Sequence, residues 1–472
     1  MTLVHTVYSA TLLALSATAV AQGDIPAWGN WRGPDHNAIA KTGNPPTEWS
    51  EEDGKNILWQ IDLPGKGSSS PIICGDRVFV TTAIETDETG KPAESPPNQG
   101  SGDERQRDSS GRDTGRRSRR FGRSRRGGFG GGRTPTKVHN FSVLAFDRQT
   151  GKQVWRTKVH STVPHAGSHR TGSQASNSPL TDGEHIFAHF GSRGIHCLDM
   201  DGKLKWSKQL GNMTTRNSFG EGSSPALHGN TLVVNWDHEA GSFVLALNKK
   251  TGKELWRTKR DERTSWSTPL IVEANGKTQV IIAATNASRS YDLKNGKMIW
   301  SLEGLTANVI PTPIYQNGLL YLMSGYRGNA VQVLNLKGAK GDLADSKKIV
   351  WTHDRNTSYT PSGLVYDGNF YFMRSNNGIL SCLDAKTGKV RYEGERLGIR
   401  SVYSSPVAAA GRVYITGREG TTKVVEAGDT FKELATNKLD DTIDASAAVV
   451  GDKLYLRGWK KLYCIADTSK DK

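Results

Sequence analysis

Histidines, carboxylates and cysteines are the side chains best suited to catalysis or metal binding, and none of them falls into a catalytic spacing. His160, His165 and His169 share one short segment, but a metal site there would need a converging carboxylate that the sequence does not identify. His238-Glu239 does not extend to an H-E-x-x-H zinc motif, and neither a G-x-S-x-G nucleophile turn nor a phosphate-binding loop occurs. We therefore predict no catalytic residue and no metal ligand, and we interpret the clustered histidines as a polar loop.

The cysteines and one acidic run point the same way. Cys74, Cys197, Cys382 and Cys464 are isolated from one another, which excludes cysteine-based zinc sites and the C-x-x-C-H motif of c-type haem. The run Asp199-Met200-Asp201-Gly202 could begin a calcium loop, but it lies in a turn that recurs along the chain. We interpret it as that turn.

Internal repeats must position these residues. One element is a short apolar strand, an Asp or Asn, a Gly-containing turn and then an aromatic residue, and it recurs at intervals of about 40–50 residues. LAFDRQTGKQVW, LALNKKTGKELW and CLDAKTGKVRY show it most clearly. We expect the aromatic rings to pack between neighbouring units, with the indole N–H directed at a carbonyl. The aromatic positions are Trp155, Trp206, Trp256, Trp300, Trp351 and Tyr392.

A second element precedes each copy of the first. It is a Ser/Thr-Pro followed by two apolar strands that a Gly-Asp, Gly-Asn or Asp-Gly turn joins, which is typical of antiparallel hairpins. Each unit therefore offers about four strands. The eight units begin at Ser69, Ser178, Ser223, Thr268, Thr312, Thr360, Ser405 and, without Pro, Asp444.

We predict an all-β fold: an eight-bladed β-propeller of four-stranded antiparallel blades over residues 56–470. Seven blades is the alternative, because the last two units are degenerate. The eighth unit lacks its aromatic strand, and Trp59 in NILWQIDLPG precedes the first unit, so we expect this N-terminal strand to close the last blade and cover the ring's edges. Equivalent positions in different blades are too far apart for a disulfide, so we predict four free, buried thiols.

The N-terminal segment and the composition of the chain suggest an exported protein. The chain has 472 residues, a formal net charge of +15 and a mean hydropathy of −0.55, which excludes a polytopic membrane protein. Residues 1–21 hold an apolar run that ends in Ala19-Val20-Ala21, and we interpret them as a cleaved secretory signal, with a short membrane anchor as the alternative. We expect a periplasmic or extracellular monomer without a transmembrane span in the mature chain, and with residues 22–55 as an N-terminal extension.

An insertion interrupts the first unit over residues 85–136. Its part from 101 to 133 holds 11 Arg against four acidic residues and almost no aliphatic residue, so we predict a disordered Arg/Gly-rich loop. It could bind a polyanion or an anionic surface, or it could be a tolerated insertion. Export argues against nucleic acid as its partner.

The loops before each Ser/Thr-Pro should surround one opening of the central channel. They form a basic and aromatic ring of side chains, which we name the collar and treat as the candidate binding site. Its alternative interpretation is a set of ordinary polar loops. The collar residues are Lys66, His165, His169, Arg170, Arg216, Trp266, Asn308, Tyr359, Arg400 and Tyr403.

The repeat resembles the pyrroloquinoline quinone (PQQ)-type β-propeller repeat, A-x-D-x-x-T-G-x-x-x-W, and the opening WGNWRGPDHNAIA resembles the start of secreted BamB-like propellers. The resemblance covers about residues 28–470 without the insertion. It implies the propeller fold, and it implies either a quinoprotein dehydrogenase or a non-enzymatic BamB-type scaffold. Quinoprotein alcohol dehydrogenases place adjacent cysteines and a calcium-binding carboxylate–Asn set beside PQQ, and neither maps onto this chain.

The favoured hypothesis is therefore a secreted or periplasmic non-catalytic scaffold that binds a protein partner through its loop face. A PQQ-dependent alcohol dehydrogenase, holding PQQ with calcium at the channel mouth, is the first alternative. A cell-wall or glycan binding module is the second. No cofactor is predicted for the favoured hypothesis.

Overall fold

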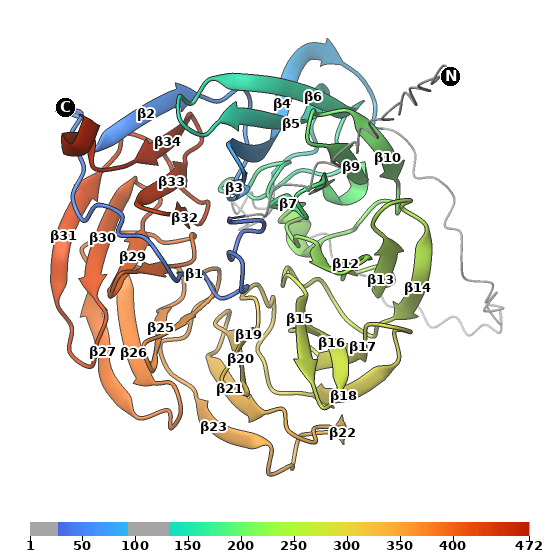
Figure 1. Ribbon diagram of the computed structural model, residues 1–472. Helices are drawn as coiled ribbons and strands as arrows, with labels where there is room; N and C mark the ends of the chain where they lie inside the picture. Colours follow the sequence, from blue (N-terminus) through green and yellow to red (C-terminus); the bar gives the residue numbers. More distant parts are fainter. Residues whose placement is uncertain (1–26, 93–131, 472) are drawn as a thin grey trace, which may run out of the picture.

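The computed structural model describes residues 27–92 and 132–471, which form an eight-bladed β-propeller around a central channel (Figure 1). Each blade has four antiparallel strands, and the helices of these residues are three short 3-10 turns. The predicted fold and the count of eight blades are confirmed, and the seven-bladed alternative is wrong. The last two units form complete blades because hairpin turns and alternating apolar residues survive in them where the aromatic signature does not.

Each blade runs from an inner strand beside the channel to an outer strand at the rim. Blades 1 to 4 consist of β3 (Ile72–Cys74), β4 (Arg77–Thr89), β5 (Lys137–Asp147), β6 (Gln153–Thr162); β7 (Leu180–Thr181), β8 (His185–His189), β9 (Ile195–Asp199), β10 (Leu204–Lys208); β11 (Ala226–His228), β12 (Thr231–Trp236), β13 (Phe243–Asn248), β14 (Glu254–Lys259); and β15 (Leu270–Ala274), β16 (Lys277–Ile282), β17 (Ser288–Asp292), β18 (Met298–Leu302).

Blades 5 to 8 follow the same pattern. They consist of β19 (Ile314–Gln316), β20 (Leu319–Ser324), β21 (Ala330–Asn335), β23 (Ile349–His353); β24 (Leu364–Tyr366), β25 (Asn369–Met373), β26 (Ile379–Asp384), β27 (Val390–Arg396); β28 (Val407–Ala409), β29 (Arg412–Thr416), β30 (Thr421–Glu426), β31 (Glu433–Lys438); and β32 (Ala448–Val450), β33 (Lys453–Arg457), β34 (Lys461–Ile465), β2 (Ile57–Asp62). Two short strands add to these sheets: β1 (Ile39–Ala40) beside β28, and β22 (Gly341–Asp342) beside β18. The 3-10 turns are η1 (Gly191–Arg193), η2 (Arg216–Ser218) and η3 (Thr468–Asp471).

Five repeat tryptophans lie between blades, each against the turn glycine of the next blade. Trp300 has neither such a glycine nor a hydrogen-bond partner for its indole N–H among the described residues, so the predicted contact is wrong there. A Cβ on Gly202 would lie 2.7 Å from the Trp155 ring, and Gly202 has φ +82°, so only glycine lets the indole lie flat there. The Trp155 Nε1–H donates to Met200 O at 3.0 Å. The same contact to the next blade recurs for Trp59, Trp206, Trp256 and Trp351. The Gly of each turn and the Trp that follows it thus serve two different junctions.

The Ser/Thr-Pro elements form a second junction around the channel. The hydroxyl of one blade accepts the backbone N–H of the blade before it, as from Ser362 N to Ser405 Oγ and from Ser405 N to Ser446 Oγ, both at 2.9 Å. Seven of the eight junctions have such a bond, all in one direction, and they include Ser446 N to Ser70 Oγ at 3.0 Å; the junction between blades 3 and 4 shows none among the described residues. In blade 6 the residue in this ring is Ser362, whereas the repeat pattern pointed to Thr360.

The N-terminal strand closes the last blade as predicted. β2 pairs antiparallel with β34, and Trp59 lies opposite Cys464 (Figure 1). The last blade therefore combines strands that lie far apart in the sequence, and the edge that an open ring would expose is paired. Cys197 and Cys382 occupy the corresponding position opposite Trp206 and Tyr392.

These three cysteines are free and fully buried, and Cys74 is buried as well. Burial raises the pKa of Cys197, Cys382 and Cys464 to about 12, so each side chain behaves as a small apolar group.

The extension before β2 crosses the channel instead of lying outside it. Trp28 exchanges backbone hydrogen bonds with Ile73 of blade 1, and β1 pairs parallel with β28 of blade 7. Asn44 N then donates to Asp452 in the first turn of blade 8. Figure 1 shows that this segment starts in the centre of the ring and then runs outward to β31, the outer strand of blade 7, and we name residues 27–50 the plug.

β4 and β5 extend further than the sequence predicted. The strand that begins at Arg77 continues to Thr89, and its pairing with β5 reaches Lys137. Most of the predicted insertion, residues 93–131, lies outside the described residues, as does the predicted signal segment 1–21. Within residues 27–92 and 132–471, no helix is long and apolar enough to span a membrane.

Candidate functional site

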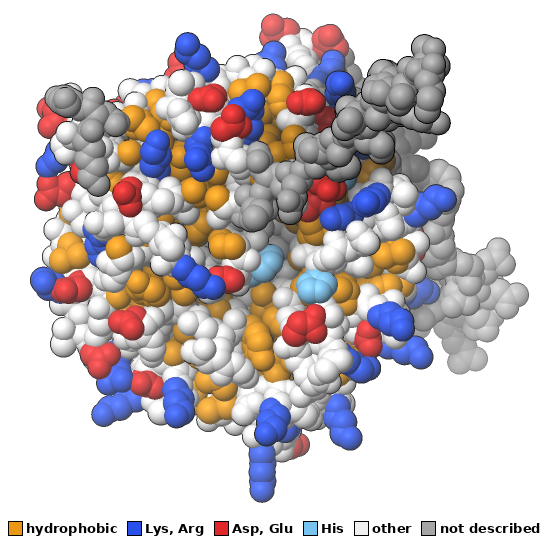
Figure 2. Space-filling model, in the orientation of Figure 1, with side chains coloured by type: hydrophobic (Ala, Val, Ile, Leu, Met, Phe, Trp, Pro, Cys, Tyr) orange, Lys and Arg blue, Asp and Glu red, His pale blue; other side chains and the backbone are white. Residues whose placement is uncertain are grey.

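The two ends of the channel are built from different parts of each blade. Because neighbouring strands are antiparallel, the loops before the first strand and between the second and third strands meet at one end, which carries the collar. The turns between the first and second strands lie at the other end, where Asn44 of the plug contacts Asp452 and Arg412. Figure 2 shows the plug end, with its charged side chains mostly at the periphery and two histidines near the centre.

The collar surrounds a cavity of about 530 Å³. Four of the ten predicted collar residues line it: His169, Trp266, Tyr359 and Tyr403. Asn308 and Arg216 lie beside Tyr359, and Arg170 lies beside His169. The structure thus brings seven of the predicted residues to one place.

The other three predicted residues have different surroundings. His165 is engaged through both ring nitrogens, with Arg193 at 2.7 Å and Met213 O at 2.8 Å, so it supports a loop. Arg400 is exposed, and its backbone N–H donates to Glu419. Lys66 sits 3.7 Å from the centre of the Trp459 ring, at the edge of the cavity.

Aromatic side chains form two walls of the cavity, each a pair of neighbouring rings. On one wall the Phe219 and Trp266 rings are 6.5 Å apart, and Trp266 Nε1–H donates to Gly220 O at 2.8 Å. On the other, the Tyr326 and Tyr359 rings are 4.8 Å apart. Burial raises the pKa of Tyr359 to about 12, so its hydroxyl stays protonated and can donate.

A stack of cations and aromatic rings forms the third side. Arg418 lies 4.8 Å from the Tyr403 ring and 5.5 Å from the Trp459 ring. Asp444 accepts hydrogen bonds from Arg418 and from Trp459 Nε1, the latter at 3.0 Å. Burial raises the pKa of Asp444, and these two donors oppose that shift. The arrangement fixes two aromatic faces at the cavity rim.

One histidine and one lysine at this end have lowered pKa values. Burial lowers the pKa of His169, and Arg170 and Arg418 lower it further. Burial also lowers the pKa of Lys66, although Asp444 opposes the shift. An added negative charge would favour the protonated form of both groups.

The carboxylates of the cavity do not fit a calcium-bound quinone. Glu221 accepts hydrogen bonds from Ser192 N and Ser192 Oγ, one on each oxygen, both at 2.5 Å. Asp444 is engaged by Arg418 and Trp459 as described, and no cysteine is among the lining residues. Both of these carboxylates therefore already accept hydrogen bonds from the protein.

Sequence reasoning missed part of the cavity. Tyr326 and Arg327 come from the loop between the second and third strands of blade 5, and Arg418 from the same loop of blade 7. Only the loops before Ser/Thr-Pro were assigned to the collar. The antiparallel alternation of strands was the signal that could have found the others, because it returns both kinds of loop to the same end.

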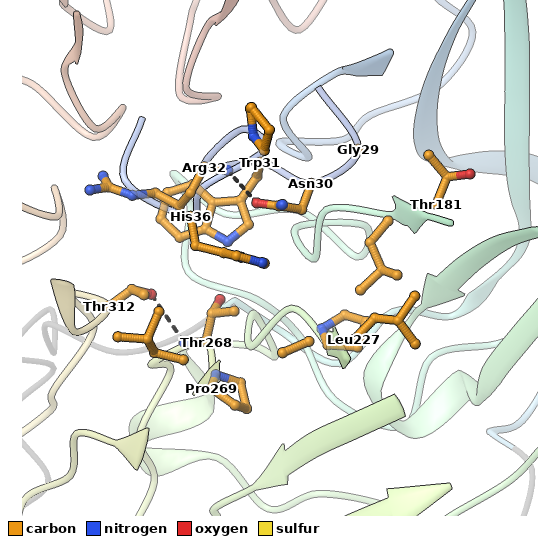
Figure 3. A pocket seen from close by; sticks show the side chains of 15 residues that line it. Gly29, Asn30, Trp31, Arg32, His36, Thr181, Leu227, Thr268, Pro269 and Thr312 are labelled. Atoms are coloured by element: carbon orange, nitrogen blue, oxygen red, sulfur yellow. Dashed lines mark hydrogen bonds between the residues drawn. The ribbon is translucent and has the colours of Figure 1, made fainter. Parts of the chain in front are cut away.

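The plug end carries a smaller cleft of about 250 Å³ (Figure 3). Trp31 and His36 of the plug form one side of it, and Leu227 and Pro269 lie on the opposite side. Gly33 has φ +75°, and a Cβ there would lie 2.9 Å from the Trp28 ring, which explains the glycine of the W-x-x-W-R-G-P opening.

Arg32 of the same motif points into the channel and is 1% exposed. Its Nη2 donates to Gly363 O at 2.9 Å, while its Nε and Nη1 have no partner among the described residues. Burial lowers the pKa of Arg32 to about 9. The guanidinium links the plug to blade 6.

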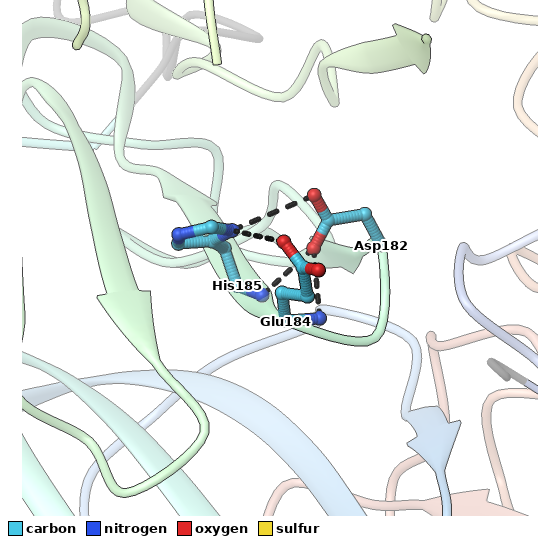
Figure 4. Close-up of side chains that lie close together, drawn as sticks. All are labelled: Asp182, Glu184 and His185. Atoms are coloured by element: carbon cyan, nitrogen blue, oxygen red, sulfur yellow. Dashed lines mark hydrogen bonds and ion pairs between the residues drawn. The ribbon is translucent and has the colours of Figure 1, made fainter. Parts of the chain in front are cut away.

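One group of side chains at this end has the composition of a metal site: Asp182, Glu184 and His185 (Figure 4). Asp182 Oδ1 accepts the backbone N–H groups of Glu184 and His185, and its Oδ2 lies 2.6 Å from Lys249 Nζ. Burial would raise the pKa of Asp182, but these partners lower it below its ordinary value. The aspartate thus caps a turn and pairs with a lysine, and we assign it a structural role.

A family model described as outer membrane protein assembly factor BamB matches residues 99–256, 139–393 and 240–471. The BamB of Yersinia pestis is 22% identical over 328 residues, 67% of this chain and 77% of that protein. The tetrathionate hydrolase of Acidithiobacillus ferrooxidans is 27% identical over 240 residues, 45% of this chain and only 44% of that relative. The quinohemoprotein alcohol dehydrogenase of Comamonas testosteroni has the same fold, with a TM-score of 0.56 and 9% identity over 95% of this chain and 81% of that one.

Proposed function

Because the chain belongs to the family described as outer membrane protein assembly factor BamB, we propose that it is an exported, non-catalytic scaffold that binds a protein partner through the collar. One observation carries the proposal. The open end of the channel holds a cavity of about 530 Å³ that is lined by aromatic side chains, of which Trp266 and Tyr403 are held by hydrogen bonds. Pre-organised aromatic side chains in a recess are the usual centre of a protein interface.

The two ends of the channel support the choice of face. The plug occupies one end with its own backbone hydrogen bonds to blades 1 and 7. The collar end is built from two loops per blade, one before the first strand and one between the second and third strands. These loops can vary without disturbing the sheets. Binding through the collar leaves both junctions of the ring intact.

The insertion adds to this face. It lies between β4 and β5, and Gly132 N at its end donates to Ser168 O, next to His169 of the cavity. The Arg-rich sequence from 101 to 133 therefore joins the propeller at the collar, where it could add attraction to an anionic partner or surface.

A PQQ-dependent alcohol dehydrogenase is the second candidate, because the propeller fold is shared with a quinohemoprotein alcohol dehydrogenase. The carboxylates of the cavity argue against it, since their oxygens already accept hydrogen bonds. A cell-wall or glycan binding module would use the same aromatic walls.

Site-specific photo-crosslinking in the native host tests the proposal. A photoreactive residue in place of Tyr359 lies in the collar cavity, and one in place of Leu227 lies in the plug-end cleft as the matched control. We expect a discrete protein adduct from position 359 and none from position 227. Adducts from position 227 alone would contradict the proposed face.

A parallel assay separates the scaffold from the enzyme. The purified protein is mixed with PQQ and calcium, and dye-linked alcohol oxidation and a bound-quinone absorbance band are measured. We expect neither signal. Alcohol oxidation or a bound-quinone absorbance band would overturn the non-catalytic function.

A further inference from the structure

We infer that the collar cavity receives an acidic peptide segment of the partner, with one aromatic or large aliphatic side chain inserted between the two aromatic walls. This inference rests on the proposed function and names the chemistry of the partner. The cavity, its charged groups and its exposed backbone each contribute a separate argument.

The walls fit an apolar anchor. The Phe219–Trp266 pair and the Tyr326–Tyr359 pair each present a ring face or edge to the cavity, and Ile310 also lines it. A volume of about 530 Å³ lies in the usual range for a recess that buries a compact ligand. Burying one aromatic side chain there would give the contact its largest apolar contribution.

The charged groups around the cavity favour a negatively charged partner. Lys66, Arg170, Arg216 and Arg327 have no carboxylate oxygen within salt-bridge distance in the described part of the chain. Lys66 and Arg327 instead lie over aromatic rings, at 3.7 and 5.4 Å from their centres. Four cations at one mouth therefore retain the capacity to pair with an incoming acid.

The two carboxylates at this mouth do not cancel that charge surplus. Glu221 is held by Ser192, and Asp444 pairs with Arg418, so one carboxylate already serves a fifth cation. Three cations at the plug end are paired instead: Lys41 lies 2.8 Å from Asp35, Arg77 lies 2.7 Å from Asp76, and Lys249 lies 2.6 Å from Asp182. The four cations of the collar mouth have no such partner among the described residues.

The exposed backbone favours a peptide over an acidic glycan. Gly222 lines the cavity, so its main-chain N–H and C=O groups can approach a ligand without a side chain between them, and Gly172 and Gly220 also line the cavity and carry no side chain. Asn217 and Asn376 add amide groups on two sides. Main-chain groups and amides together suit the regular donors and acceptors of a peptide backbone.

Short peptides of defined sequence test the inference on the full-length protein. The probes are fluorescein-labelled Glu-Asp-Trp-Asp-Glu, the same peptide with Lys at the four acidic positions, and the acidic peptide with Ala in place of Trp. Fluorescence anisotropy gives the affinities at two salt concentrations. We expect only the acidic Trp peptide to bind, and its affinity to fall as salt rises.

Three variants locate the binding. Arg216→Glu combined with Arg327→Glu should weaken the acidic peptide at least tenfold, and Trp266→Ala should weaken it by a similar factor. Lys41→Glu combined with Arg77→Glu reverses the same number of charges at the plug end and should change the affinity less than twofold. Circular dichroism and thermal unfolding of each variant verify the fold.

Two results would overturn the inference. One is equal binding of the acidic and basic peptides, or equal binding by the collar and plug-end variants. The other is binding of oligogalacturonate in place of the peptide, which would assign the cavity to acidic glycans. If the peptide fails while the adduct from position 359 persists, only the partner chemistry is wrong. If the peptide binds and the adduct is absent, the proposed protein partner is wrong.

Discussion

The same repeated blade builds both ends of the channel, but the chain itself fills only one of them. At the plug end the chain fills its own opening, with Trp28 fully buried against Gly33 and paired to Ile73. At the collar end aromatic rings remain around an open cavity, and Lys66 and Arg327 remain without carboxylate partners in the described residues. One end is filled by the chain itself, and the other is left with unused binding capacity.

This difference separates stability from recognition. The plug contributes buried apolar area and hydrogen bonds to blades 1, 6 and 7. The collar contributes little to the junctions between blades, which depend on the tryptophan contacts and the serine ring. Substitutions in the plug should therefore change stability without changing binding at the collar, and substitutions in the collar should do the reverse. The following experiments test this expectation.

The largest effect should follow from Trp28→Ala. Removing a fully buried indole from the plug should lower the free energy of unfolding by about 3–5 kcal/mol. Urea unfolding followed by fluorescence measures the loss, and Trp31→Ala, which removes a half-buried ring of the same motif, should cost clearly less. The affinity of the collar for the acidic peptide should not change. A loss of that affinity would show that the two ends are coupled.

The second effect is pH dependence from a histidine beneath the collar. His189 is buried between blades 2 and 3, where its Nδ1 contacts Asn177 and Ser223, and burial lowers its pKa from 6.5 to about 4. Above pH 6.5 both the folded and unfolded forms are neutral. As pH falls from 6.5 toward 4, only the unfolded chain gains the proton, so the free energy of unfolding should fall by about 3 kcal/mol.

Urea unfolding at pH 7.0 and 4.5 measures this change, and His189→Gln is the test variant. The variant should lose this part of the pH dependence whatever its stability at pH 7.0. His196, also buried with its pKa lowered to about 4, titrates in the same range and remains as the internal control. An unchanged pH slope in the variant would contradict the assignment to His189.

The blades could be predicted from the sequence because one local rule specifies each of them. The turn glycine, the Trp and the alternating apolar residues recur, and the structure contains a blade for each copy, down to Trp59 opposite Cys464. Ser362 shows the limit of the rule. The Pro of blade 6 precedes the ring serine instead of following it, so the motif by itself pointed to Thr360.

The partners of the plug and the side-chain packing of the missed cavity loops could not be predicted, since neither follows the repeat. Trp28 and Arg32 find their partners in blades 1 and 6, and no local pattern encodes contacts that distant in the sequence. Tyr326 and Arg418 lie in loops whose length and composition differ from blade to blade. Their position followed from the topology, and their side-chain packing did not.

The smallest effect should come from the serine ring, which belongs to neither end. Ser405 Oγ accepts the backbone N–H of Ser362 at 2.9 Å, and both residues are buried. Ser405→Ala leaves that N–H without an acceptor and should lower the free energy of unfolding by about 1–2 kcal/mol. Ser405→Thr keeps the hydroxyl and should restore most of the loss. Because the ring links blades without facing either opening, Ser405→Ala should leave peptide binding at the collar unchanged. If Ser405→Ala is as stable as the parent, the hydrogen bonds of the serine ring do not contribute to the free energy of unfolding. The tryptophan contacts would then be the main stabilising junction between blades.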